Sequence, residues 1–396
     1  MSRSERGSQS SATAPQQDRG RRCFMKSTEY GQLRRPGFPH RRDFLKLPLG
    51  AGAAQALLLG GAAGAVPHKD EYDPENTKIA SKVAVSTLTD DELLFLKQIG
   101  LRWVHADFGN NGAYEFVKST QERFAGHGIK IHCGLLEAYH SKRIQLGQPG
   151  RDEDIEKFQV FIRDCGRLGI PVVHIDFHPG NTYTTNMIES PRGYKCREFS
   201  VDDFHQKIEK QMFDRQYSAE DIWANYTYFL KAVLPVAEKA NVRLAHHPDD
   251  PPLPMMNGVA KVFINYDGYR HAEQVAAGGS ENWGLCFCVG TWSEGGDKMG
   301  KDVLGMIQDF GKRDKIFTVH FRNVSSPLPR FHETFQDDGY LDMYQVMKAL
   351  RQVRCNASLI PDHYPGLVSD TNRRLAEAYM ISQMRTLLRR ANEEVG

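Results

Sequence analysis

Cysteine is scarce in this chain of 396 residues, and the glycine-rich signatures of nucleotide binding are missing. Seven cysteines in a chain of this length are too few for a small disulfide scaffold. No G-x-G-x-x-G string and no P-loop follows an early strand, which argues against a dinucleotide-binding or nucleotide-hydrolysing protein. Long apolar runs are also lacking, because glycine and proline interrupt the most apolar stretch, residues 47–65. The composition is that of an ordinary globular protein.

A surplus of positive charge is absent from most of the chain. The formal net charge is +2, but residues 1–46 alone hold 11 Lys and Arg against four Asp and Glu. Residues 66–396 carry 40 basic and 45 acidic side chains, and are therefore mildly acidic. We expect no nucleic-acid partner, since such binding depends on neutralising phosphates with basic side chains.

The basic leader has the order of an export signal. The string HRRDFLK (40–46) is followed by the uncharged stretch 47–65, which ends on Ala63-Gly64-Ala65, an A-x-A pattern suited to signal peptidase. The RR-x-F-L-K part resembles the twin-arginine signal, so we expect residues 1–65 to be a signal peptide, starting at Met1 or Met25. The protein would then be periplasmic, without a stable membrane span after cleavage. The alternative is a basic tail and a short apolar helix, with the protein left in the cytoplasm.

Short apolar runs alternate with amphipathic stretches throughout the rest of the chain. This pattern predicts a single (β/α)8 TIM barrel of class α/β over residues 66–396, with a doubly wound sheet as the competing fold. The expected strands are 82–87, 102–108, 130–136, 171–177, 242–247, 284–289, 316–321 and 358–362. The expected helices are 90–99, 114–126, 152–168, 219–240, 270–277, 302–310, 342–353 and 372–391.

Two long inserts interrupt this regular spacing. Residues 177–218 are rich in His, Asn, Thr, Arg and Tyr, and residues 324–341 include His332 and Glu333. Both inserts follow strands, so in a barrel both lie at the C-terminal face, where active sites form. Loops of this length are usually functional lids or disordered segments.

The last four predicted strands each end on a residue that can bind a metal. These are His247, Cys288, His320 and Asp362, separated by 41, 32 and 42 residues, or about one βα unit each. Two imidazoles, a thiolate and a carboxylate suit Mn²⁺, Fe²⁺, Co²⁺ or Zn²⁺. Taken singly, a histidine at a strand end is more often a core residue and Cys288 a small buried apolar group. Their coincidence favours a metal site.

Polar groups suited to a polyhydroxy acid surround these four. Asp249 and Asp250 lie in a proline-rich turn after His247, and Arg322 could clamp a carboxylate. A surface or inter-strand ion pair is the alternative for Arg322. His363 is placed for proton transfer, provided the backbone twists there, because neighbouring residues of a strand point to opposite faces.

Five strings in this order resemble the mannonate dehydratase family. They are HPDDPP (247–252), GLCFCVGT (284–291), HFRNV (320–324), FHETFQDDGYLDMYQVMKAL (331–350) and PDH (361–363), and the resemblance covers residues 81–390. It implies a xylose-isomerase-like TIM barrel that uses Mn²⁺ or Fe²⁺. It also implies removal of water from a small sugar acid, D-mannonate, to give 2-dehydro-3-deoxy-D-gluconate.

The resemblance also implies roles for single residues. His247, Cys288, His320 and Asp362 would be the metal ligands. His363, Arg322 and Tyr364 would be catalytic, with Arg322 stabilising the negative charge that develops on the substrate carboxylate. The expected substrate-binding residues are Asp249, Asp250, Arg322, His332 and Glu333.

The sequence departs from the family between the PDH string and the last helix. Family members carry there a tyrosine followed by I-G-R, whereas residues 364–374 read YPGLVSDTNRR. Tyr364, or a tyrosine of segment 183–194, is expected to take that place. Two other functions stay open: a metal-dependent sugar isomerase or epimerase on the same barrel, and an exported sugar-acid binding protein without catalysis. Assembly into a homo-oligomer is a further open possibility.

Overall fold

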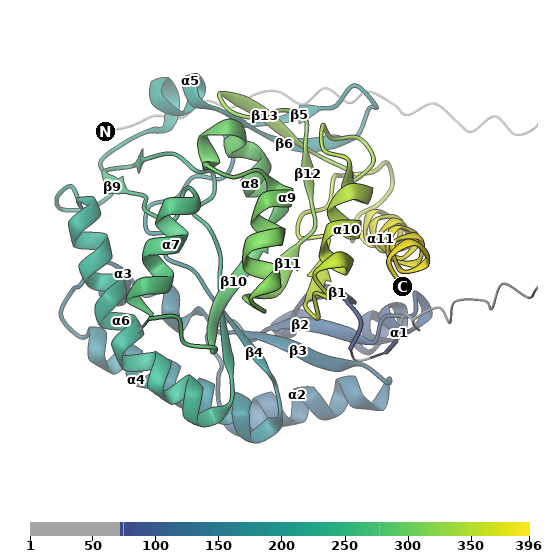
Figure 1. The fold of residues 1–396 in the computed structure, drawn as a ribbon, viewed down its shortest axis with the longest axis horizontal. Helices are drawn as coiled ribbons and strands as arrows, with labels where there is room; N and C mark the ends of the chain where they lie inside the picture. The colour runs from purple at the N-terminus through teal and green to yellow at the C-terminus, as the bar shows by residue number, and fades with distance from the viewer. Residues whose placement is uncertain (1–71, 74, 277) are drawn as a thin grey trace, which may run out of the picture. The chain divides into compact units, whose positions relative to one another are not determined.

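Eight parallel strands form a closed barrel, as the sequence predicts (Figure 1). The computed structural model describes residues 72–396 except 74 and 277, so the predicted signal peptide lies outside the described residues. The strands follow one another round the barrel in the order β1-β14-β11-β10-β7-β4-β3-β2. They are β1 (Lys78–Ala84), β2 (Trp103–Asp107), β3 (Lys130–Leu135), β4 (Val172–Ile175), β7 (Arg243–His246), β10 (Trp283–Cys288), β11 (Ile316–His320) and β14 (Ser358–Ile360).

The helices surround the barrel and begin at sequence-coded caps. Thr89 accepts a hydrogen bond from the Glu92 amide at the start of α1, and Ser218 and Asp221 form a capping box at α6. The expected helix 302–310 is split into α9 (Val303–Met306) and the π-helical turn η6 (Ile307–Gly311). The other main helices are α1 (Asp90–Gln98), α2 (Tyr114–Gly126), α4 (Arg151–Leu168), α6 (Ala219–Ala240), α7 (Tyr266–Val275), α8 (Val289–Gly295), α10 (Met343–Gln352) and α11 (Arg374–Val395).

The main core lies between the strands and the surrounding helices. Phe158 of α4 and Phe229 of α6 pack with ring centroids 5.8 Å apart, in one continuous cluster with residues of the strands. Burial of these apolar faces is what fixes the helices on the barrel. Within the described part of the chain, no helix has both the length and the hydrophobicity needed to cross a membrane.

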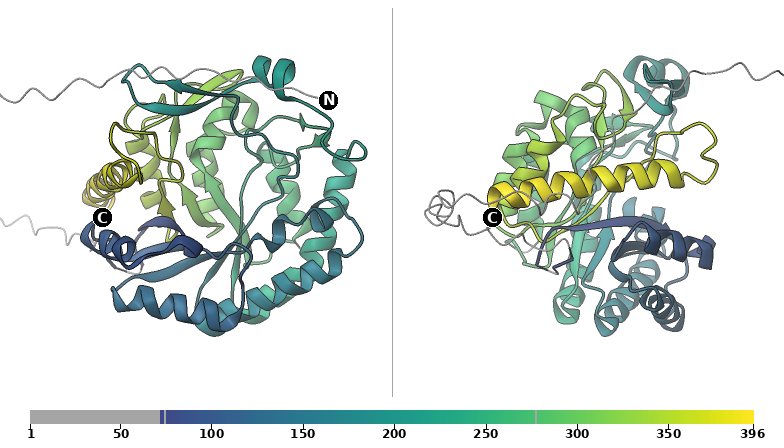
Figure 2. Two further views of the ribbon diagram at one scale, coloured as in Figure 1. Left: turned by 180° about the vertical axis from the view of Figure 1, so that it is seen from behind. Right: turned by 90° about the vertical axis from the view of Figure 1, so that its right-hand side faces the viewer.

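The two inserts form a small antiparallel sheet rather than open loops. Its strands are β5 (Asn186–Glu189), β6 (Lys195–Ser200), β12 (Asn323–Val324) and β13 (Arg330–Thr334), in the order β12-β13-β6-β5. We call this the mouth sheet, because it lies at the end of the barrel where β10 and β11 finish (Figures 1 and 2). The pairing of β6 with β13 joins the insert after β4 to the insert after β11.

Several short elements complete the C-terminal face and the connections. Two of them, η3 and α3, follow β3 and form one side of the barrel mouth. The short elements are η2 (Val85–Thr87), η3 (Glu137–His140), α3 (Lys142–Gln145), α5 (Val201–Asp203), η4 (Phe204–Ile208), β8 (Met255–Met256), β9 (Val259–Ala260) and η5 (Gly296–Met299).

Candidate active site

A cavity of about 340 Å³ opens at the C-terminal end of the barrel. Its lining includes five of the site residues expected from the sequence, His247, Asp250, His320, Asp362 and His363. The remaining lining residues come from the first four strands and the elements after them, from the mouth sheet, and from the end of β14. The volume suits a small ligand, in the place where barrels of this type carry their active sites.

Three of the four expected metal ligands come together at this cavity. The ligand atoms of His247, Cys288 and His320 all lie within 4.8 Å of one another, and all three residues are buried. The alternation of strand residues explains why His247 is in the site and its neighbour is not. His246 instead packs against Tyr226 of α6, with ring centroids 5.0 Å apart.

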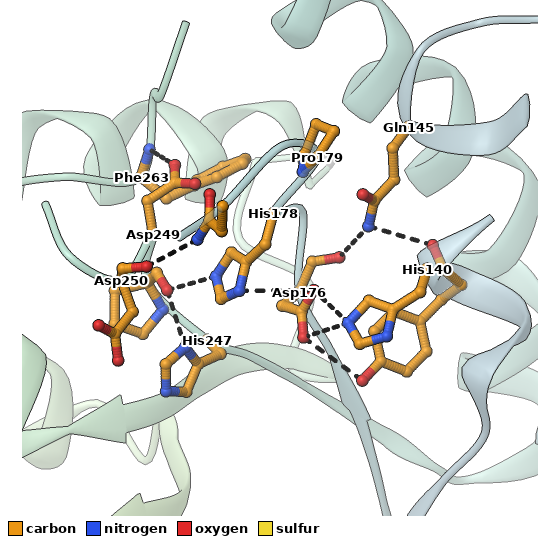
Figure 3. Close-up of polar contacts among 12 residues, drawn as sticks. His140, Gln145, Asp176, His178, Pro179, His247, Asp249, Asp250 and Phe263 are labelled. Carbon is orange, nitrogen blue, oxygen red and sulfur yellow. Dashed lines mark hydrogen bonds and ion pairs between the residues drawn. The ribbon is translucent and has the colours of Figure 1, made fainter. Parts of the chain in front are cut away.

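One backbone carbonyl orients two of the histidines. His247 donates from Nδ1 to the Pro248 oxygen at 2.7 Å, and His178 donates from Nε2 to the same oxygen at 2.5 Å (Figure 3). Because a carbonyl only accepts, these nitrogens carry the hydrogens. Nε2 of His247 is then the nitrogen left with a lone pair, which is how proteins usually present a metal-ligating histidine.

Cys288 is held in surroundings that favour its thiolate. Burial alone would raise the thiol pKa, but the Arg322 guanidinium and His247 outweigh it and hold the pKa of Cys288 well below its usual range. The Thr291 amide, in the first turn of α8, donates to Sγ at 3.4 Å. A thiolate is the form of cysteine that binds metals, so this side chain is prepared for that role.

Asp362, the fourth expected ligand, reaches the same cluster through an unusual backbone conformation. Its φ of +70° is in the left-handed region, which non-glycine residues seldom adopt. Its Oδ1 lies 3.2 Å from Nδ1 of His320. The twist at this residue lets both Asp362 and His363 line the cavity, as the sequence requires if both are to act there.

Arg322 lies behind this cluster and is only 2% exposed. Its guanidinium donates to Asp362, Glu294 and Asp250 at 3.1, 2.7 and 2.7 Å. These bonds commit the guanidinium to buried ion pairs, which differ from the surface or inter-strand pair considered as the alternative, and the expected contact with a substrate carboxylate stays a prediction. A Cβ on Gly290 would lie 2.5 Å from the Arg322 side chain, so the glycine makes room for it.

His363 is paired with Glu333 of the mouth sheet. Its Nδ1 lies 2.5 Å from Oε1 of Glu333, and its Nε2 lies 3.7 Å from Oδ2 of Asp362, beyond hydrogen-bonding distance. Burial would lower the pKa of His363, but Asp362 and Glu333 raise it above its usual value. His332 is the preceding residue of the same strand and lies outside the cavity lining, because consecutive strand residues point to opposite faces.

Asp249 and Asp250 have different places. Asp250 lines the cavity and accepts from Thr291 Oγ1 at 3.0 Å as well as from Arg322. Asp249 is 1% exposed, and its Oδ2 accepts from the amides of Val262 and Phe263 at 3.1 and 3.0 Å. The expected contact of Asp249 with substrate is therefore not supported, since its carboxylate fixes the loop after β9 instead.

The two candidate tyrosines are also separated. The Tyr364 hydroxyl lies 3.0 Å from Ser81 Oγ and is buried away from the cavity lining. Tyr183, from the first insert, lines the cavity, and its hydroxyl lies 3.2 Å from Nδ1 of His178. Since Nε2 of His178 donates to Pro248, Nδ1 is the acceptor and the phenol is the donor.

The wall opposite the metal-binding candidates was not anticipated. His140 donates from Nε2 to both carboxylate oxygens of Asp176 at 2.7 Å (Figure 3). Its Nδ1 lies 2.7 Å from Glu137 Oε2. Burial works against its charge, but Asp176 and Glu137 raise the pKa of His140 to about 10. This wall therefore carries an imidazolium between two carboxylates.

A second group of three possible metal ligands shares His320 with the first. The ligand atoms of His174, Cys286 and His320 also lie within 4.8 Å of one another. Burial raises the pKa of Cys286, while His320 and His174 lower it, with a result of about 7. The sequence contains a pattern that could have predicted this wall. His174, Asp176 and His178 are spaced by two, which places them on one face of an extended segment.

Comparisons with known proteins point to one enzyme family. The sequence signature of D-mannonate dehydratase (UxuA) matches residues 197–385. The mannonate dehydratase of Streptococcus pneumoniae (strain 70585) is 32% identical over 246 residues, which are 56% of this chain and 66% of that protein.

Solved structures extend the likeness to most of the described chain. The mannonate dehydratase from Streptococcus suis serotype 2 superimposes with a TM-score of 0.71 and 26% identity, covering 81% of this chain and 96% of the other. A xylose isomerase-like TIM barrel protein from Mycobacterium smegmatis, at 10% identity, has a TM-score of 0.53 over 81% of this chain and 99% of the other, which shows the shared fold alone. The fold, the family signature and these relatives together show that the chain belongs to the mannonate dehydratase family.

Proposed function

We propose that this protein is a metal-dependent hydro-lyase that converts D-mannonate to 2-dehydro-3-deoxy-D-gluconate and water. The observation that carries the proposal is the convergence of His247, Cys288 and His320 at a cavity that His247, His320 and His363 line. Membership of the mannonate dehydratase family supports the choice of substrate.

Four residues would hold the metal, with Mn²⁺ or Fe²⁺ as the expected ion. His247, Cys288, His320 and Asp362 offer two imidazoles, a thiolate and a carboxylate, a set that suits such ions. When bound, the ion supplies a Lewis acid that stabilises negative charge on the substrate. Arg322 acts from behind, because its bond to Asp362 fixes the direction of that carboxylate.

Two residues would move the protons. The reaction removes the proton from C2, breaks the C3–O bond and protonates the departing hydroxyl to water. The resulting enol then takes a proton at C3 and becomes the 2-oxo product. His363, held by Glu333, and Tyr183, held by His178, line the cavity and would divide the first two transfers between them.

The direct test is an assay of the purified protein with Mn²⁺ and D-mannonate for a 2-keto-3-deoxy acid. We expect product that disappears on chelation and returns when the metal is restored. Bound metal together with an isomerised sugar acid, without loss of water, would replace the proposal by an isomerase. Sugar-acid binding without any reaction would replace it by a binding protein.

Export is a separate proposal that rests on the leader sequence. The string HRRDFLK and the A-x-A pattern at 63–65 support transport by the twin-arginine route. We expect a fusion of residues 1–70 to a reporter to reach the periplasm, and the fusion carrying Arg41→Lys and Arg42→Lys to stay inside. A wild-type fusion that remains in the cytoplasm would overturn this proposal.

A further inference from the structure

A substrate carboxylate needs a cation, and Arg322 is not free to supply it. Its guanidinium is buried and donates to three carboxylates of the protein. His140 is also committed, since both of its ring nitrogens face carboxylates. Lys82 and Arg197 are the Lys and Arg side chains among the described residues that line the cavity.

These two cations differ in their partners. Lys82 Nζ lies 3.4 Å from Asp107 Oδ2, so its charge is compensated by a neighbour on the barrel. Arg197 is half-buried, and among the described residues its charge acts on the Glu333 carboxylate, whose pKa it helps to lower, without a hydrogen bond to it. A guanidinium in this state favours an anion, and its planar donors match a carboxylate in two parallel hydrogen bonds.

The position of Arg197 relates it to the proton-transfer residue. Arg197 lies on β6, and the antiparallel register pairs Phe199 with Phe331 and Glu198 with His332. One residue further, the same register sets Arg197 opposite Glu333, whose carboxylate already holds His363. Side chains opposite one another in a sheet share a face. Arg197 and the Glu333–His363 pair therefore lie at the same end of the cavity.

We propose that Arg197 receives the carboxylate of the substrate and thereby places C2 beside His363. The proposal rests on the proposed function for the identity of the acid, and on the structure for the choice of residue. In an aldonate the carboxylate is the single anionic group and is bonded to C2. Fixing it at Arg197 therefore fixes the carbon that loses its proton.

The test compares Arg197→Met and Arg197→Lys with Arg192→Met. Arg192 lies in the same hairpin, but it pairs with Asp337 at 3.2 Å and is absent from the cavity lining. Binding of D-mannonate to the metal-loaded protein is measured by calorimetry, with His363→Gln present in every variant so that turnover is slow during the titration. Bound metal and melting temperature are recorded for each variant.

We expect Arg197→Met to weaken D-mannonate binding by about 10- to 100-fold, the usual effect of losing charge-assisted hydrogen bonds. Arg197→Lys keeps the charge but loses the paired geometry, so its loss is smaller. Arg192→Met binds normally, and metal content and melting temperature stay unchanged in all variants. With His363 intact, KM rises in Arg197→Met, and raising the salt concentration increases KM more in wild type than in that variant.

Normal D-mannonate binding by Arg197→Met would overturn this inference, and so would an equal loss in Arg192→Met. The inference and the proposed reaction can fail separately. Arg197-dependent binding without any turnover in the wild type would refute the dehydration and keep the anion site. Turnover with an unchanged KM in Arg197→Met would refute the anion site and keep the reaction.

Discussion

The two walls of the cavity use similar residues in opposite ways. On the wall of β7, β10 and β11, the ligand atoms of His247, Cys288 and His320 lie within 4.8 Å of one another, and Nδ1 of His320 lies 3.2 Å from Asp362 Oδ1. On the wall of β3 and β4, each ring nitrogen of His140 faces a carboxylate. Possible metal ligands thus converge on the first wall, whereas the histidine of the second wall is paired with carboxylates on both sides. The convergence of ligand atoms, more than the mere presence of histidine, distinguishes the candidate metal-binding wall from the supporting one.

The largest effect is expected when the wall of β7, β10 and β11 loses one of its candidate metal ligands. Cys288→Ala and His320→Ala should lose the metal and reduce kcat/KM by about 10⁴-fold, because a bound metal contributes several kcal/mol to such reactions. Metal analysis by mass spectrometry and the product assay check this. Cys286→Ala is the matched control, since Cys286 belongs only to the second group of possible ligands.

Cys286→Ala should retain metal and most of the activity. The opposite pattern, with metal lost in Cys286→Ala and kept in Cys288→Ala, would move the ion to the group of His174, Cys286 and His320. The metal would then be held by residues of both walls, because His174 belongs to β4.

The next effect concerns proton transfer without loss of the metal. His363→Gln should lower kcat by about 10²- to 10³-fold, the usual contribution of general acid–base catalysis. Glu333→Gln should cost less, because a glutamine amide can still contact Nδ1 of His363. Both variants should contain as much metal as the wild type, and a His363→Gln enzyme with full kcat would exclude His363 from the reaction.

A smaller effect is expected from the support behind the metal wall. Gly290→Ala places a methyl group 2.5 Å from the Arg322 side chain, which must then move away from Asp362. We expect metal affinity to fall by about 10- to 100-fold, as when partners of metal ligands are removed. Titration with a metal indicator measures this. Gly126→Ala is the control, because a Cβ there meets no atom within 4 Å.

The smallest effect is a pH-dependent loss of stability on the opposite wall. The pKa of His140 is raised to about 10 in the folded protein, against about 6.5 in an unfolded chain. Its contribution is therefore complete below pH 6.5 and is lost as the pH rises through 10. His140→Gln should cost about 1–2 kcal/mol at pH 6 and much less at pH 10.5, as measured by urea unfolding.

The control for this prediction is His205→Gln. His205 forms a similar pair with Glu209 at 2.6 Å, but on an exposed surface, where such pairs contribute little. An equal pH dependence in both variants would show that burial of the His140–Asp176 pair has no special effect.

The barrel and three of the candidate metal ligands could be predicted from the sequence. The alternation of short apolar runs with amphipathic stretches predicted all eight barrel strands. It does so because buried parallel strands appear in a sequence as short apolar runs. The spacing of His247, Cys288 and His320 placed them at successive strand ends, and they do meet. Strand alternation also explains why His247 rather than His246 faces the cavity.

The features that the sequence did not predict depend on contacts between distant segments of the chain. Arg322 was expected to face the substrate, but its partners Glu294, in α8, and Asp250, in the loop after β7, are 28 and 72 residues away. Tyr364 was expected in the site because it follows His363, yet the backbone directs it to Ser81. The mouth sheet escaped prediction since its strands are short and polar, and are stabilised by pairing between the two inserts.

The mouth sheet also constrains the order in which the protein can assemble. Ser200 of β6 and Arg330 of β13 are 130 residues apart in sequence and adjacent in the sheet. Closing a loop of that length costs conformational entropy before the β6–β13 pairs can stabilise the fold. We therefore expect these pairs to form after the barrel strands between them. Pulse-labelled hydrogen exchange during refolding would reveal the reverse order if β13 became protected first. In the expected order, the chain acquires its metal-binding wall early, and Arg197 and Glu333 join it in the final stage of folding.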